Sequence, residues 1–208
     1  MSKSIYFFGQ SVFGQLISLI DKQEVTKAVI ETGSDKFCKG FYTWDHLVTM
    51  LFCSFSHCTS LREVVAGCLG LKGKTEHFGL RQLPRRSTLS DANLKRSPAV
   101  FEAIYTSLLK QYQTCISDSR IKERFKKDVF IIDSTTISLF QSILKCVGRK
   151  PKSGKEKGGI KVHTLLKADQ NVPELVWYSE SATHDLNFWD KITFKPDALY
   201  VFDKGYID

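Results

Sequence analysis

Two aspartates in the sequence follow short apolar segments of similar composition. Asp133 comes directly after Val-Phe-Ile-Ile at 129–132, and Asp203 comes directly after Leu-Tyr-Val-Phe at 199–202. A carboxylate on an apolar strand is costly to remove from water unless it is paired, hydrogen-bonded or bound to a metal. The residues alone leave two alternatives: a strand end closed by a local Asp-Ser-Thr turn, or a ligand site.

The ligand alternative depends on the two segments being neighbouring strands. In that case the carboxylates converge, and a divalent cation removes the repulsion between them. Carboxylate oxygens suit Mg²⁺ or Mn²⁺, which also bind water and phosphate oxygens. The pair of aspartates therefore predicts a metal-dependent phosphoryl-transfer site.

The elements that must carry these aspartates are short strands in the second half of the chain. Segments rich in β-branched and aromatic residues predict four strands and one intervening helix. The predicted strands are 128–139, 159–169, 173–183 and 198–207, and the helix is 185–192.

The first half is predicted to be helical, from apolar residues at i, i+3 and i+4. The predicted helices are 13–33, 43–58, 60–70, 88–95 and 97–113. Gly33 ends the first, Ser60 with Glu63 has capping-box spacing, and Thr43, Ser87 and Ser97 are expected N-caps. The fold class is therefore α+β, with a helical domain over 1–126 and a sheet-bearing domain over 127–208.

Positive charge is concentrated in the first half. Residues 1–127 contain 19 Lys and Arg against 11 Asp and Glu, whereas residues 128–208 contain 11 of each. This asymmetry predicts a polyanionic partner for the helical half. Candidate phosphate contacts are the basic residues Arg81, Arg85, Arg86, Lys95 and Arg96. A solvated basic loop and helix is the alternative for this segment.

A second basic run lies between the first two predicted strands. Residues 145–161 contain seven Lys and Arg against one Glu, with several glycines. Lys150, Lys152 and Lys155 are the candidate phosphate contacts here. A solvated loop without a ligand is the alternative reading of the same composition.

The segments IIDSTTI (131–137), GGIKVHTLLKAD (158–169) and YVFDKGYID (200–208) resemble the catalytic core of DDE transposases, in particular the insertion-sequence-four family of bacterial elements. Asp133 in IDST and Asp203 in DKGY match the first two acidic residues of that family. The helical half, with LPRRSTLSDANLKR at 83–96, looks like the N-terminal domain that this family often carries.

The resemblance implies an RNase H-like mixed sheet in which the first and fourth strands are adjacent, with only strands 1 to 4 in this chain. Asp133 and Asp203 would hold Mg²⁺ or Mn²⁺, which would activate water and later the freed 3′-hydroxyl for strand transfer. Lys204 and Tyr206 would position DNA, with packing under the strand as the alternative for Tyr206. His163 is expected to be a hydrogen-bonded sheet residue.

The resemblance also implies a third acidic residue, a glutamate on a later helix. No Glu follows Asp203 in the sequence. We therefore expect a C-terminally truncated transposase with little or no DNA cleavage and strand-transfer activity. The alternatives are a non-catalytic DNA-binding protein that occupies element ends and inhibits the full protein, or another RNase H-like DNA nuclease.

The expected partner is double-stranded DNA, at element ends and target, and a homodimer on DNA is compatible with that expectation. No signal peptide or membrane-spanning segment is evident, so a bacterial cytoplasmic, nucleoid-associated protein is expected. The six cysteines form no Cys-x-x-Cys pair, which favours reduced thiols over a zinc site.

Overall fold

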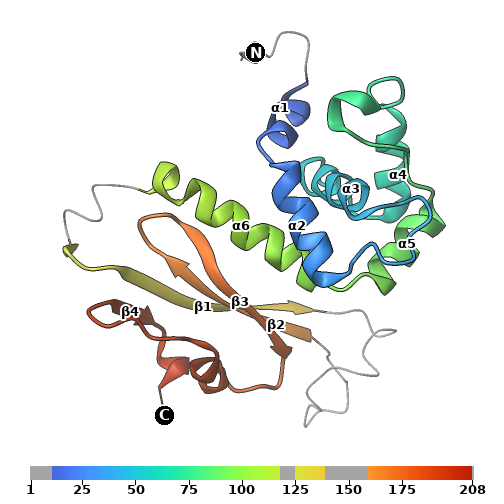
Figure 1. Cartoon of the computed structure of the whole chain (residues 1–208). Coiled ribbons are helices and arrows are strands. Elements are labelled where there is room, and N and C mark those ends of the chain that lie inside the picture. The colour runs from blue at the N-terminus through green and yellow to red at the C-terminus, as the bar shows by residue number, and fades with distance from the viewer. Residues whose placement is uncertain (1–10, 118–124, 139–158, 208) are drawn as a thin grey trace, which may run out of the picture. The chain divides into compact units, whose positions relative to one another are not determined.

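The computed structural model describes residues 11–117, 125–138 and 159–207 (Figure 1). The chain divides into two compact units, Met1–Gln111 and Tyr112–Asp208. The division falls inside helix α6 (Ala99–Ile116), before the boundary that the sequence suggested at residue 126. We refer to the two units as the helical unit and the sheet unit.

The helical unit consists of α-helices joined by short loops and one 3₁₀ turn. In chain order these are α1 (Val12–Ser18), α2 (Lys22–Thr32), α3 (Thr43–Phe55), α4 (Leu61–Leu69), η1 (Thr75–Phe78), α5 (Arg86–Lys95) and α6. The prediction of one helix over 13–33 was wrong. Asp21 caps a new helix by accepting a hydrogen bond from the Gln23 N–H at 2.8 Å, so the chain breaks there.

Two of the capping residues predicted from the sequence are confirmed at the helix ends, and two others are not. Gly33 ends α2 in the left-handed conformation (φ 62°), and Ser60 accepts from the Glu63 N–H at 3.3 Å, both as predicted. Thr43 is not an N-cap, because Tyr42 holds that position and Thr43 begins the helix. Ser87 is not an N-cap either, since α5 already begins at Arg86.

The core of the helical unit forms where α3 packs against the other helices. Val48, Val64, Leu89 and Val100 come from α3, α4, α5 and α6 in turn and are completely buried. Burial of each such side chain contributes on the order of 1.5–3 kcal/mol. This packing places the start of α3 and the chain around residue 80 in fixed positions in the unit.

The sheet unit contains one four-stranded mixed sheet in the order β3-β2-β1-β4. The strands are β1 (Val129–Ser138), β2 (Gly159–Lys167), β3 (Val172–Glu180) and β4 (Leu199–Phe202). β1 pairs antiparallel with β2 and parallel with β4. The α+β fold class and the adjacency of the first and fourth strands are therefore confirmed.

Two 3₁₀ segments follow the strands: η2 (Asp185–Lys191), where a helix was predicted, and η3 (Lys204–Tyr206) after β4. Phe188 of η2 and Tyr206 of η3 pack against one face of the sheet, where Phe130 and Ile132 are buried. These two segments therefore cover this face of the sheet.

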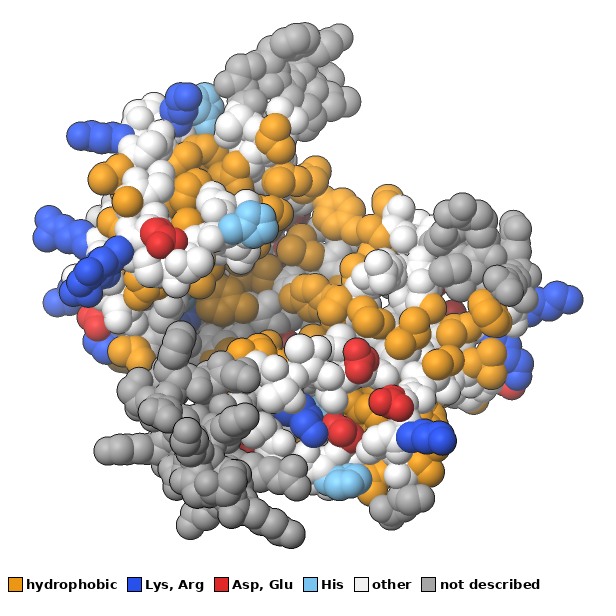
Figure 2. Space-filling view, turned by 180° about the vertical axis from the view of Figure 1, so that it is seen from behind, with side chains coloured by type: hydrophobic (Ala, Val, Ile, Leu, Met, Phe, Trp, Pro, Cys, Tyr) orange, Lys and Arg blue, Asp and Glu red, His pale blue; other side chains and the backbone are white. Residues whose placement is uncertain are grey.

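The opposite face of the sheet carries apolar side chains that reach the surface. Ile131 is 40% exposed although its neighbours Phe130 and Ile132 are buried, and Val201 of β4 is 54% exposed. Figure 2 shows hydrophobic side chains at the molecular surface, with acidic side chains among them. The sheet is thus covered on one face by the described residues.

No helix in the described part of the chain has the length and apolar character needed to cross a bilayer.

Candidate active site and nucleic-acid interface

Strands β1 and β4 bring the two predicted metal ligands to equivalent positions. Their parallel register pairs Ile132 with Phe202. Asp133 is the next residue of β1, and Asp203 is the first residue after β4. Paired positions on adjacent strands direct side chains to the same side, and successive residues alternate. The register therefore brings the backbone at Asp133, within β1, close to the backbone at Asp203, directly after β4.

Each carboxylate accepts a hydrogen bond from the backbone N–H of the residue that follows it, Asp133 within β1 and Asp203 as the N-cap of η3. The backbone N–H of Ser134 donates to Asp133 Oδ1 at 2.7 Å, and the N–H of Lys204 donates to Asp203 Oδ1. Both aspartates are exposed. Oδ1 of each aspartate is thus held by the backbone N–H of the next residue. This hydrogen bond orients the side chain and leaves Oδ2 for another ligand.

The alternative of a strand end closed by a local Asp-Ser-Thr turn is wrong for Asp133, because β1 continues through these residues to Ser138. Asp203, in contrast, directly follows β4 and caps η3. A backbone hydrogen bond to one carboxylate oxygen orients the other, as partners of metal ligands commonly do. The donor set of two adjacent carboxylates fits a hard divalent cation completed by water and phosphate oxygens. Among the described residues, no group of three or more His, Cys, Asp or Glu side chains is placed to hold a metal.

Tyr206, which the sequence offered as a DNA contact, is 4% exposed. Its hydroxyl lies 3.3 Å from His163 Nδ1, and His163 Nε2 lies 3.0 Å from Ser179 Oγ. Its backbone carbonyl accepts a hydrogen bond from the Trp189 indole N–H at 3.1 Å. The DNA-contact prediction does not fit this burial, whereas the alternative of packing under the strand does.

His163 is completely buried and hydrogen-bonded, as expected for a sheet residue. Burial lowers the pKa of His163, against the opposing charge of Asp185. A neutral imidazole accepts the Tyr206 O–H at one nitrogen and donates to Ser179 with the other. Burial also raises the pKa of Tyr206. Both groups are therefore uncharged members of the buried core of the sheet unit.

Lys161 and Asp185 form a further ion pair in this region. Lys161 Nζ lies 3.1 Å from Asp185 Oδ1 and 3.2 Å from the carbonyl of Thr183. The side chains are 15% and 21% exposed. Asp185 was not predicted as a site residue, and its start-of-helix position gave no signal for this pairing.

The basic residues predicted to contact DNA fall into three groups. Arg81, Arg85, Arg86, Lys95 and Lys204 are exposed. Arg96 is not available, since its side chain is 4% exposed. Lys150, Lys152 and Lys155 lie outside the described residues.

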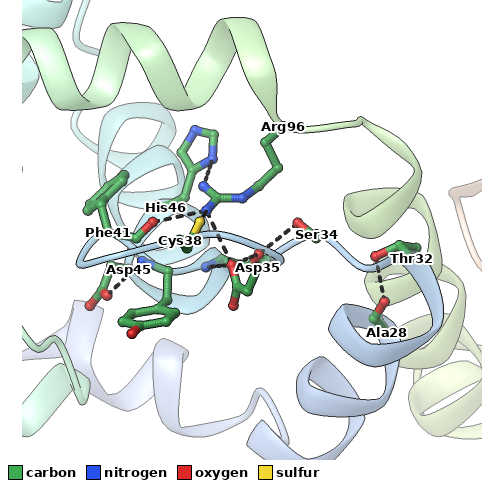
Figure 3. A network of polar contacts seen from close by, with 11 residues as sticks. Ala28, Thr32, Ser34, Asp35, Cys38, Phe41, Asp45, His46 and Arg96 are labelled. Carbon is green, nitrogen blue, oxygen red and sulfur yellow. Dashed lines mark hydrogen bonds and ion pairs between the residues drawn. The ribbon is translucent and has the colours of Figure 1, made fainter.

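The buried Arg96 side chain lies at the centre of a polar network inside the helical unit (Figure 3). Its Nη2 donates to Asp35 Oδ1 at 3.2 Å and to the Phe41 carbonyl at 2.9 Å, and its Nη1 donates to His46 Nδ1 at 2.9 Å. His46 Nε2 lies 2.6 Å from Asn93 Oδ1. Burial lowers the pKa of His46, so the imidazole is neutral and accepts from Arg96.

The same network fixes the loop between α2 and α3. Asp35 Oδ1 also accepts from the Thr43 N–H at 2.8 Å and from its hydroxyl at 2.7 Å, while Ser34 Oγ lies 2.8 Å from Thr43 Oγ1. Asp45 accepts from the Arg81 N–H at 2.9 Å and from the Tyr42 N–H at 3.3 Å. The first turn of α3 and the chain at residue 81 are thereby tied together.

Comparison with known proteins gives two matches. Residues 8–81 match the family described as "Domain of unknown function (DUF4372)". Over 123 aligned residues the chain is 29% identical to the protein named "Putative transposase y4zB" of Sinorhizobium fredii (strain NBRC 101917 / NGR234). The alignment covers 59% of this chain and 32% of that relative, so the chain spans about a third of the relative's length. No solved structure matches the chain.

Proposed function

We propose that this chain is part of a DDE-type transposase, with a DNA-binding helical unit and a sheet unit that contributes Asp133 and Asp203 to a metal site. The observation that supports the proposal is the β1–β4 register, which pairs Ile132 with Phe202, the residues directly before Asp133 and Asp203. The similarity to the Sinorhizobium fredii protein supports the same class.

Asp133 and Asp203 would act as ligands to Mg²⁺ or Mn²⁺. The bound cation would supply Lewis-acid activation of water for phosphodiester hydrolysis at a DNA end. The chain's own contribution is to hold two carboxylates rigidly, because each is tied to its backbone through Oδ1. Lys204 is exposed directly beside Asp203 and is placed to contact a DNA phosphate.

A non-catalytic DNA-binding protein is the second candidate. It is favoured by the finding that the described residues contain no three-carboxylate group, whereas DNA contacts need only the exposed basic side chains of the helical unit. In this role the chain would occupy DNA ends without cleaving them.

Metal binding tests the first candidate without requiring activity. We expect Mn²⁺ to bind the full chain in the presence of duplex DNA, as followed by electron paramagnetic resonance. Asp133→Asn and Asp203→Asn should each lower the Mn²⁺ affinity at least tenfold, since each removes one charged ligand. Asp197→Asn is the matched control, because that carboxylate is 92% exposed and lies away from the pair's register.

Duplex binding tests the part of the proposal that both candidates share. The affinity for duplex DNA should fall steeply between about 50 and 200 mM salt, because phosphate contacts release counterions. Normal Mn²⁺ affinity in both aspartate variants would remove these residues from a metal site. Salt-dependent DNA binding with no Mn²⁺ site would favour the second candidate, and the absence of DNA binding would reject both.

A further inference from the structure

The helical unit contains a cavity of about 370 Å³, bounded by α2, the start of α3 and residues 79–81. This volume is within the range of small-ligand pockets, about 300–1,000 Å³. Its lining combines two aromatic rings, two cations and two carboxylates: Lys22, Asp35, Tyr42, Trp44, Asp45 and Arg81. The sequence analysis did not find this site, because its residues are spread over 22–81 and no local motif joins them.

Both cations of the cavity are held over aromatic rings. Lys22 Nζ lies 4.8 Å from the ring centroid of Trp44, and the guanidinium carbon of Arg81 lies 4.4 Å from that of Tyr42. Contacts of this kind, within about 6 Å, order long side chains before any ligand arrives. An ordered cation loses less conformational entropy when it binds an anion.

The carboxylates are already engaged in ion-pair and hydrogen-bond contacts within the fold, whereas the contacts described above for the cations are with aromatic rings. Asp35 pairs with the buried Arg96, and Asp45 accepts two backbone N–H groups. Over residues 11–117, neither Lys22 nor Arg81 takes part in an ion pair. The cavity therefore presents two cations that lie over aromatic rings and have no ion-pair partner within residues 11–117.

The position of these residues is maintained by close packing around the cavity. The Trp44 indole N–H donates to the Phe78 carbonyl at 3.0 Å, which fixes the ring. Gly79 adopts φ 62°, and a Cβ at this position would collide with the Lys22 ammonium. The positive φ favours glycine at residue 79, and a Cβ there would displace the flexible end of the Lys22 side chain.

We propose that this cavity binds a single unpaired nucleotide of DNA, with Lys22 and Arg81 contacting the phosphate and the rings of Tyr42 and Trp44 contacting the base. The inference rests on the proposed DNA-binding function of the helical unit and adds the form of DNA recognised. A base inside a duplex cannot enter such a cavity, so the nucleotide is one at a single-stranded tail or an opened end. Stacking of a base on an aromatic side chain contributes about 1–3 kcal/mol.

Two variants and one control distinguish DNA binding in the cavity from DNA binding that depends only on the protein's net charge. Lys22→Glu removes the cation, and because residue 22 is the first residue of α2, a carboxylate there favours the helix N-terminus. Tyr42→Leu removes the ring while keeping an apolar side chain. Lys72→Glu is the matched control, since it makes the same charge change at an exposed residue that does not line the cavity.

The experiment measures fluorescence anisotropy of a labelled duplex with a short single-stranded tail and of the same duplex with blunt ends. For the full chain, the tailed duplex should bind about tenfold more tightly, which corresponds to roughly 1.4 kcal/mol. Lys22→Glu and Tyr42→Leu should abolish this tail preference, while Lys72→Glu should retain it. Deoxyadenosine monophosphate should compete with the tailed duplex only.

Equal affinity for the two duplexes, or a tail preference that survives both cavity variants, would overturn the inference. In that case persistent duplex binding would leave the proposed function standing. Binding of the free mononucleotide without any tail preference would also overturn it, because the cavity would then serve a free nucleotide. A protein that binds neither duplex would reject the proposed DNA-binding function together with this site.

Discussion

Arg96 and Asp35 lie 61 positions apart in the sequence, yet Arg96 Nη2 is 3.2 Å from Asp35 Oδ1 inside the helical unit. The Arg96 side chain is 4% exposed and that of Asp35 is 20% exposed. The pair joins the end of α5 to the loop before α3 (Figure 3). Tyr42, which lines the cavity, is the N-cap residue at the end of this loop. Removing one partner would leave the other buried without its countercharge.

Replacement of Arg96 should therefore be strongly destabilising. We expect Arg96→Met to lower the free energy of unfolding by about 3 kcal/mol, because loss of one member of a buried ion pair commonly costs about 3–5 kcal/mol and Asp35 is partly exposed. Urea unfolding followed by far-ultraviolet circular dichroism measures the change. Arg86→Met, at an exposed residue of α5, should change it by less than about 0.5 kcal/mol. Equal effects of the two substitutions would mean that Arg96 is a surface residue.

The buried imidazole of His46 should make the helical unit sensitive to acid. Its pKa is lowered from about 6.5 by burial, so between that value and the lower folded pKa the unfolded chain binds more protons. This contribution to the free energy of unfolding is complete above about pH 6.5 and is lost as the pH falls below it. Urea unfolding at pH 7.5 and 5.5 should show a smaller pH effect for His46→Gln than for the parent chain.

The exposed His77 supplies the control for this measurement. His77→Gln should leave the pH dependence of the parent chain unchanged. If His46→Gln and His77→Gln behave alike, the acid sensitivity does not come from the Arg96 network.

Cysteine reactivity should follow burial. Cys68 is 1% exposed, and burial raises the pKa of its thiol to about 11. At pH 8 its thiolate fraction is then on the order of 0.1%, and thiolate is the reacting species. Iodoacetamide should modify the exposed Cys115 in the native protein and modify Cys68 only after urea unfolding, as read by peptide mass spectrometry. Native-state labelling of Cys68 at the rate of Cys115 would contradict this burial.

The sheet could be predicted because its signals are local. Short segments rich in β-branched and aromatic residues marked each strand, and Asp133 and Asp203 follow apolar segments of similar composition. Their adjacency follows from the resemblance to a known fold and is confirmed by the β1–β4 pairing. The helix ends at Gly33 and Ser60 were also predictable, since glycine and serine act on their own neighbours.

The predictions from sequence failed where residues far apart in the chain determine the environment of a side chain, or where the pattern of apolar residues hid a helix end. Arg96 reads as one cation in a basic run, and only the packing of α2, α3 and α5 brings Asp35, His46 and Phe41 to it. The break at Asp21 was hidden because apolar residues continue at helical spacing on both sides of it. The cavity with Lys22 and Arg81 likewise depends on segments far apart in the chain.

Adjacent isoleucines in β1 provide a test of which sheet face forms the core. Ile132 is 2% exposed and packs with Phe188 and Tyr206, whereas Ile131 is 40% exposed on the other face. Ile132→Ala should lower the free energy of unfolding by about 3 kcal/mol, because it removes a transfer contribution and leaves a void. Ile131→Ala, the matched substitution one residue away, should cost less than about 1 kcal/mol. Urea unfolding of the two variants followed by tryptophan fluorescence, to which Trp177 and Trp189 of the sheet unit contribute, gives both values. A cost for Ile131→Ala as large as that for Ile132→Ala would show that the second face of the sheet is also covered in solution.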